Sequence, residues 1–224
     1  GQQMLEPTHI PALLDAIDIT HDLKHAVAGT DLVSESVSET LAIKRAVHAE
    51  LDTLCRPETL ITTNTSGLLV SDIEDAVIHG ERFAALHSHL GSRLFDIVGG
   101  PRMSTSSVET LRRYVISLNC VPLVLKKENP GYVLNAMLGP LLTTALLLVA
   151  DGTATKEDVD RAWMRSENAA IGPFGLMDLF GLNVISDSWQ HPKPNMEHLQ
   201  EKVLVFISPY IEAGHLDAKS GRGF

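Results

Sequence analysis

Two polar side chains, a hydroxyl and an imidazole, follow neighbouring strand-like segments and could together act on an alcohol or a carbonyl. Residues 60–63 form a strand-like run that ends in a polar turn containing Ser66, and residues 83–87 form a second run that ends in His87. In an open α/β sheet, ligands bind outside the carboxyl ends of the strands, so both side chains are expected at one edge. Histidine exchanges a proton near neutral pH, which the interconversion of an alcohol and a ketone requires. His89 would point the same way as His87 and is an alternative base.

The elements that must position these side chains alternate between strands and helices in the first part of the chain. Strands are predicted over 17–20, 30–37, 60–63, 83–87, 94–98 and 121–125, and helices over 22–28, 41–54, 70–78 and 106–118. This alternation is typical of an α/β fold with a mostly parallel sheet.

The second part of the chain has no strand signal after Pro130-Gly131. Helices are predicted over 132–150, 156–164, 174–180 and 197–210. We therefore predict a sheet domain at 1–130 and an all-α domain at 131–224. The apolar segment 132–150 is long enough to span a bilayer, but Asn135 and Gly139-Pro140 interrupt it, which favours a core or subunit-interface helix.

Composition excludes several classes of function. The formal net charge is -10 and no Lys/Arg cluster is interleaved with aromatic residues, so nucleic acid and anionic membranes are poor partners. Cys55 and Cys120 lie far apart and lack metal-ligand spacing, and no signal peptide is evident. We expect a cytoplasmic enzyme without a bound metal.

Seven motifs follow one another along the chain: SETLAIK (38–44), TNTS (63–66), ERFAALH (81–87), KKENPGYVLNAML (126–138), GTATKEDVDRAW (152–163), IGPFGLMDLFGL (171–182) and KSGRGF (219–224). In this order they resemble the NAD-dependent 3-hydroxyacyl-CoA dehydrogenases, of the 3-hydroxybutyryl-CoA dehydrogenase type. The resemblance runs from about Asp31 to the last residue. The resemblance implies a partial Rossmann-like, doubly wound sheet domain followed by an α-helical substrate and dimerisation domain.

The resemblance also implies roles for particular residues. His87 matches the family's catalytic acid/base, Ser66 matches a serine between nicotinamide and substrate, and Asn135 matches an asparagine that helps to hold the substrate carbonyl. Asp96 is the candidate carboxylate partner of His87, although the family has a glutamate further from the histidine and an Asn-Pro pair that is absent here. The arginine that usually follows the asparagine is Ala136 in this chain.

Four side chains resemble cofactor contacts. Glu39 and Lys44 match a glutamate and a lysine near the nicotinamide ribose, and Lys219 matches a lysine near the cofactor. Ser66, between nicotinamide and substrate, is the fourth. By spacing alone, Glu39 is equally well explained as an acid in the first turn of a helix. The G-x-G-x-x-G fingerprint of a dinucleotide-binding domain does not occur in the sequence. By the resemblance, the opening βα units would precede Gly1, and we favour a longer gene product over a protein that never had them.

The predicted function is NAD-dependent interconversion of a 3-hydroxyacyl-CoA and a 3-oxoacyl-CoA in fatty-acid metabolism, by a homodimer. Two alternatives stay open at this point. The same fold could act on a small hydroxy acid, or the chain could be a non-catalytic homologue without the cofactor site.

Overall fold

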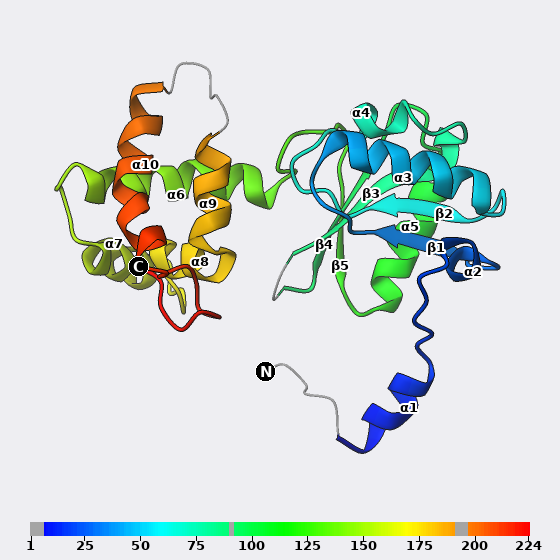
Figure 1. The fold of residues 1–224 in the computed structure, drawn as a ribbon, viewed down its shortest axis with the longest axis horizontal. Coiled ribbons are helices and arrows are strands. Elements are labelled where there is room, and N and C mark those ends of the chain that lie inside the picture. The colour runs from blue at the N-terminus through cyan, green and yellow to red at the C-terminus, as the bar shows by residue number, and fades with distance from the viewer. Residues whose placement is uncertain (1–6, 90–91, 191–196) are drawn as a thin grey trace. The chain divides into compact units, whose positions relative to one another are not determined.

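The fold is described from a computed structural model that covers residues 7–89, 92–190 and 197–224. The chain folds into two compact units, Gly1–Val133 and Leu134–Phe224, each shown in Figure 1. The first unit contains the sheet and the second contains helices, as the sequence predicts for its fold class.

The sheet of the first unit is mostly parallel. Within the described residues its strand order is β1 (Leu32–Glu35), β2 (Leu60–Thr63), β3 (Phe83–Ser88), β4 (Leu94–Gly99) and β5 (Val121–Val124). The pairs β1·β2, β2·β3 and β4·β5 are parallel, whereas β3 and β4 form an antiparallel hairpin. This one reversal decides the geometry of the site, because it sets residues of β3 directly opposite residues of β4.

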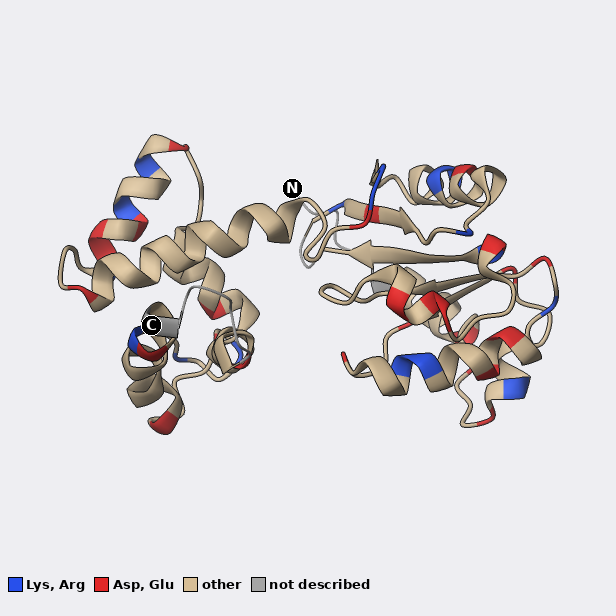
Figure 2. Ribbon diagram, turned by 90° about the horizontal axis from the view of Figure 1, so that it is seen from above, with Lys and Arg blue, Asp and Glu red and all other residues tan. Residues whose placement is uncertain are grey.

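Helices cover both faces of this sheet, which Figure 2 shows nearly edge-on. On one face, α3 (Leu41–Leu54) and α4 (Val70–Glu74) pack with Phe83 and Ala85 of β3; on the other, α5 (Thr105–Ser117) packs with Ala84 and Leu86. Successive strand residues point to opposite faces, so β3 is buried on both sides up to His87, which belongs to the face of α3 and α4.

The remaining elements of the first unit precede or connect these. They are the 3₁₀ turns η1 (Pro7–His9) and η2 (Gly80–Arg82) and the short helices α1 (Ile10–Asp15) and α2 (Leu23–Val27). The strand predicted over 17–20 is wrong, since those residues have no regular structure and Ile19 is 87% exposed. The helix predicted over 70–78 is shorter, because it ends at Glu74 in a turn that Asp52 supports by accepting from the backbone of Ile78 and His79.

The second unit consists of helices around a core that includes Leu146, Met177 and Ile207. They are α6 (Leu134–Ala150), α7 (Lys156–Ser166), α8 (Pro173–Phe180), α9 (Leu182–Gln190) and α10 (Glu197–Glu212). Helix α9 was not predicted from the sequence. Helix α6 carries no charged residue, as its uniform colour in Figure 2 shows. Across the described parts of the chain, no helix combines the length and the hydropathy needed to cross a bilayer.

Candidate active site

His87 and Asp96 face each other across the β3–β4 hairpin. They are register partners, and opposite residues of an antiparallel pair have their side chains close together. His87 Nδ1 lies 3.2 Å from Asp96 Oδ2, with His87 6% exposed and Asp96 fully buried. The aspartate side chain reaches the ring because the antiparallel register sets the two residues directly opposite each other.

A second imidazole shares the same carboxylate oxygen. His89 Nε2 lies 2.7 Å from Asp96 Oδ2, and the rings of His87 and His89 are 4.6 Å apart in an edge-to-face arrangement. The His89 N–H donates to Leu94 O, which extends the pairing of the two strands past Ser88 and keeps both rings on one side. Asp96 Oδ1 is buried and has no hydrogen-bond partner within the described part of the chain. The carboxylate therefore accepts from two rings at one oxygen.

The surroundings of His87 lower its pKa. Burial is the largest cause, the hydrogen bond and the charge of Asp96 oppose it, and the nearby His89 adds to the lowering. A lowered pKa keeps the ring neutral at pH 7 and able to accept a proton. Because Asp96 is an acceptor, we assign the ring proton to Nδ1, which leaves Nε2 as the atom that exchanges a proton with a substrate.

Within the described residues, His87, His89 and Asp96 also form the cluster that could bind a metal ion. One ligand atom from each of His87, His89 and Asp96 lies within 4.8 Å of the others. Two imidazole N–H donors on one carboxylate account for this proximity without an ion, and they match the chemistry of a proton-exchanging site.

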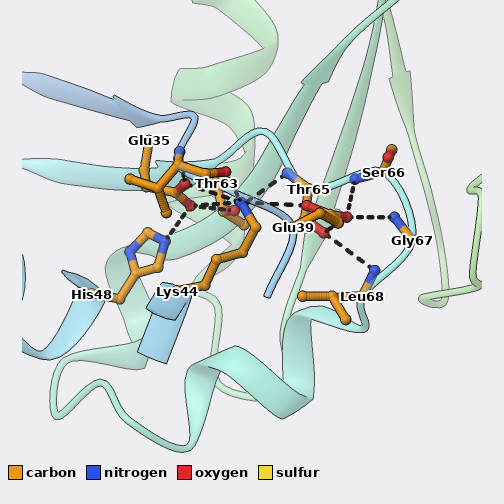
Figure 3. Close-up of polar contacts among 10 residues, drawn as sticks. Glu35, Glu39, Lys44, His48, Thr63, Thr65, Ser66, Gly67 and Leu68 are labelled. Carbon is orange, nitrogen blue, oxygen red and sulfur yellow. Dashed lines mark hydrogen bonds and ion pairs between the residues drawn. The ribbon is translucent and has the colours of Figure 1, made fainter. Parts of the chain in front are cut away.

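The loop after β2 is held beside the end of β3 and carries Ser66. Asn64 Oδ1 accepts from the backbone N–H of Ser88 at 3.0 Å, which ties this loop to the strand that carries His87. Glu39 Oε1 accepts from Thr65 Oγ1 at 2.5 Å and from the backbone N–H groups of Ser66 and Gly67 at 2.9 and 3.0 Å (Figure 3). The Ser66 side chain is exposed at this edge and available to a ligand.

Glu39 fixes this loop as a hydrogen-bond acceptor. Burial would raise the pKa of its carboxyl group, but the hydrogen bonds from Thr65, Gly67 and Ser66 and the charge of Lys44 lower it overall. The side chain keeps 43% exposure, so Glu39 can support the loop and still face a ligand.

Lys44 lies beneath Glu39 and is only 1% exposed. Its ammonium group donates to both oxygens of Glu35 at 3.0 and 3.2 Å and to Val37 O at 3.3 Å, and it lies 3.4 Å from Glu39 Oε2 (Figure 3). Within the described residues, the Lys44 ammonium group is thus used by Glu35, Val37 and Glu39. The predicted role of Lys44 at the cofactor stays a prediction, and the contacts seen here support Glu39 from below the surface.

Glu35 anchors that buried network. His48 Nε2 lies 2.9 Å and Thr63 Oγ1 2.7 Å from its Oε2. Burial alone would raise the pKa of Glu35, but the hydrogen bonds from His48, Thr63 and Lys44 lower it to about 2. The sequence analysis did not single out Glu35 or His48. Lys44 and His48 lie one turn apart on the buried face of α3, and polar residues in such positions need a buried partner, which was the available signal.

Two further predicted site residues belong to the second unit. Asn135 is half-buried in the first turn of α6, and Lys219 is exposed in the segment after α10. The structure describes both residues only within the second unit, and their roles at the site stay predictions.

Tyr132 is a candidate site residue that the sequence analysis missed. Its ring centre lies 5.3 Å from that of His87, the residue is 4% exposed, and its hydroxyl has no hydrogen-bond partner in residues 7–89, 92–190 and 197–224. Its position directly after Pro130-Gly131, at the predicted domain boundary, was the available signal.

The residues present fit one end of a dinucleotide. Glu39 and Ser66 offer a carboxylate and a hydroxyl at the carboxyl edge of parallel strands, where the ribose and ring of a nicotinamide would bind. The glycine-rich turn that binds a pyrophosphate is not among the residues of this sequence.

A mostly parallel sheet with a histidine–carboxylate pair at its strand ends, followed by a helical unit, fits an oxidoreductase of the dehydrogenase type. Comparison with known families agrees: residues 2–128 match "3-hydroxyacyl-CoA dehydrogenase, NAD binding domain" and residues 131–224 match "3-hydroxyacyl-CoA dehydrogenase, C-terminal domain". The chain belongs to the 3-hydroxyacyl-CoA dehydrogenase family, whose members are NAD-dependent oxidoreductases.

The relatives are named for different substrates. The chain is 32% identical over 230 residues to the mitochondrial hydroxyacyl-coenzyme A dehydrogenase of Sus scrofa, covering 100% of this chain and 71% of that protein. It is 29% identical over 214 residues to 5-formyl-3-hydroxy-2-methylpyridine 4-carboxylate 5-dehydrogenase of Mesorhizobium japonicum, covering 92% and 69%. A solved diketoreductase, described as acting on dicarbonyl compounds, superposes with a TM-score of 0.87 at 32% identity, covering 95% and 75%.

Proposed function

We propose that the protein interconverts a 3-hydroxyacyl-CoA and a 3-oxoacyl-CoA in fatty-acid metabolism, with His87 as acid/base. The observation that carries this proposal is the buried His87–Asp96 pair at 3.2 Å, opposite each other at the end of the central strands. A carboxylate on one ring nitrogen fixes the tautomer and orientation that proton exchange at the other nitrogen requires.

In the oxidative direction, His87 Nε2 accepts the proton of the substrate hydroxyl as the carbinol carbon becomes a ketone. A nicotinamide bound beside Glu39 and Ser66 would supply the acceptor for the hydride that leaves this carbon. The proton on Nε2 makes the ring an imidazolium, which the buried carboxylate of Asp96 stabilises. In the reductive direction, the same nitrogen returns the proton to the oxygen of the ketone.

Other residues of the chain bind and orient the substrate. Ser66, exposed at the strand edge, donates a hydrogen bond to the reacting oxygen, and Glu39 keeps its loop in place through three hydrogen bonds. Asn135 binds the substrate carbonyl, and Lys219 contributes to the cofactor side. A hydroxyl held in one geometry contributes to rate by orienting the reacting atoms.

A small hydroxy or oxo acid is the second candidate substrate. Two observations favour it: the Mesorhizobium relative is named for a substituted pyridine carboxylate, and the solved relative for dicarbonyl compounds. The segment after His87 also lacks the Asn-Pro pair of the family pattern, and its His89 forms a hydrogen bond with Asp96.

Measured turnover separates the two substrates. The full-length protein would be assayed for NADH oxidation with acetoacetyl-CoA, with free acetoacetate and with a simple diketone. We expect the highest kcat/KM with acetoacetyl-CoA. A higher kcat/KM with the small compounds would favour the second candidate, and no turnover with any of them would contradict the proposed reaction.

We further propose that the protein works as a cytoplasmic homodimer. Helix α6 has no charged residue and exposes Met137 (62%) and Leu148 (38%), and both cysteines are free thiols, which suits a reducing compartment. Light scattering at micromolar concentration would show twice the chain mass, and a stable monomer would count against the dimer.

A further inference from the structure

Tyr132 has a buried hydroxyl group that finds no hydrogen-bond partner among the described residues. Among the described residues, four buried side-chain atoms lack a hydrogen bond: His48 Nδ1, Arg82 Nε, Asp96 Oδ1 and Tyr132 Oη. His48, Arg82 and Asp96 each bond through another atom. The side chain of Tyr132 has only its hydroxyl, so this side chain makes no hydrogen bond within the described residues. Burying an unpaired hydroxyl costs about 1–3 kcal/mol, which calls for an explanation.

The backbone of Tyr132 is also held in an uncommon conformation. Its φ is +50°, and the other non-glycine residues with positive φ in the described chain are asparagines, which tolerate this region. Asn129 keeps the turn in place: its backbone carbonyl accepts from the N–H of Tyr132 at 2.9 Å, and its side-chain amide donates to Tyr132 O at 3.2 Å. Local strain that the surroundings enforce is found at ligand sites more often than elsewhere.

The ring of Tyr132 lies against the proposed acid/base: its centre is 5.3 Å from that of His87, with the ring planes at 52°. Burial is the main cause of a raised pKa for Tyr132, and the charges of Glu39, Asp96 and Glu128 raise it further. A hydroxyl that keeps its proton can donate to an oxygen of a ligand.

We propose that the Tyr132 hydroxyl donates a hydrogen bond to the reacting oxygen of the substrate, beside His87. The ligand class is a compound with a ketone or secondary alcohol at the reacting carbon. Tyr132 is thus a further catalytic residue, and this inference rests on the proposed function. The Tyr132 hydroxyl binds the reacting oxygen and discriminates against analogues without that oxygen, while His87 transfers the proton.

The test compares the full-length wild type with Tyr132→Phe and with Tyr114→Phe, a control at a residue that is 41% exposed on α5. Because a neutral hydrogen bond is lost, kcat/KM for acetoacetyl-CoA should fall about 3- to 10-fold in Tyr132→Phe only. Binding of butyryl-CoA, which lacks the 3-oxygen, should not change. The melting temperature should stay equal or rise, since the variant removes an unpaired buried group.

Wild-type kinetics in Tyr132→Phe would overturn the inference. If wild type itself has no activity, the proposed function fails and not this inference alone. If Tyr132→Phe does not fold, 3-fluorotyrosine can be incorporated at position 132 alone in the otherwise unchanged protein. The ¹⁹F signal of Tyr132 should then shift with acetoacetyl-CoA more than with butyryl-CoA, and equal shifts would refute the proposal.

Discussion

The Asp96→Asn variant removes the charge that stabilises the imidazolium form of His87 while keeping the size of the side chain. Asp96 is fully buried, and its Oδ2 lies 3.2 Å from His87 Nδ1 and 2.7 Å from His89 Nε2. The variant therefore changes the interactions of the two imidazole rings and leaves the protein surface unchanged. We expect both the maximal rate and its pH dependence to change.

The size of the effect follows from the lost interaction. Hydrogen bonds to a charged group contribute about 1.5–3 kcal/mol. If this energy stabilises the charged ring in the transition state, kcat falls about 10- to 150-fold. The hydrogen bond and the charge of Asp96 raise the pKa of His87 against burial, so the variant lowers that pKa further.

The sign of the pH effect can be measured in the reductive direction, where His87 must be protonated. The rate falls as pH rises through the pKa of His87, and in Asp96→Asn this fall should begin at lower pH. The control is Asp75→Asn, whose side chain is 79% exposed on the same unit. An Asp96→Asn variant with wild-type kcat and an unshifted pH profile would refute the role of the carboxylate.

Further variants test the rest of the site. His89→Asn should move the same fall in rate to higher pH, opposite to Asp96→Asn, because the nearby His89 lowers the pKa of His87; an unchanged profile would remove His89 from the site. Glu39→Ala should raise KM for NADH more than it lowers kcat, since the carboxylate holds the Ser66 loop by three hydrogen bonds; an unaltered KM, with fluorescence titration of NADH as a check, would contradict this. Lys44→Met should lower the free energy of unfolding by about 3–5 kcal/mol, because Glu35 keeps a buried charge without its cation; chemical denaturation measures this. The pKa of Glu35 falls from 4.5 to about 2 on folding, so its contribution of about 3 kcal/mol is present above pH 4.5 and lost as pH falls towards 2. Glu35→Gln should flatten acid unfolding over that range.

Much of the fold could be predicted because it follows local patterns. The boundaries of β2 and α3 are confirmed as predicted, and β3 differs by one residue, since apolar runs and helical spacing mark these elements. The strand predicted over 17–20 failed, because a short apolar run forms a strand only where it has a neighbour to pair with. Helix α9 was not predicted because the β-branched residues Val184 and Ile185 have low helix propensity. The helix forms in the structure because Leu182 and Trp189 are buried in the core of the second unit.

The site could be predicted in part, for a similar reason. His87 ends a strand and His89 follows it by two residues, so the sequence places both rings on one side. The contact of Asp96 with both rings depends on the register of the hairpin, which no local pattern gives. The burial of Lys44 and the unpaired hydroxyl of Tyr132 depend on side chains from distant parts of the chain.

The central claim is that His87 exchanges the proton during hydride transfer at a carbonyl. It is tested most directly by NADH oxidation with acetoacetyl-CoA, comparing the full-length wild type with His87→Gln, and with His79→Gln as a control at an exposed histidine. Removing a general acid costs about 10²- to 10⁴-fold, so kcat should fall by that factor in His87→Gln while NADH still binds. A His87→Gln variant that turns over acetoacetyl-CoA at the wild-type rate would contradict the account.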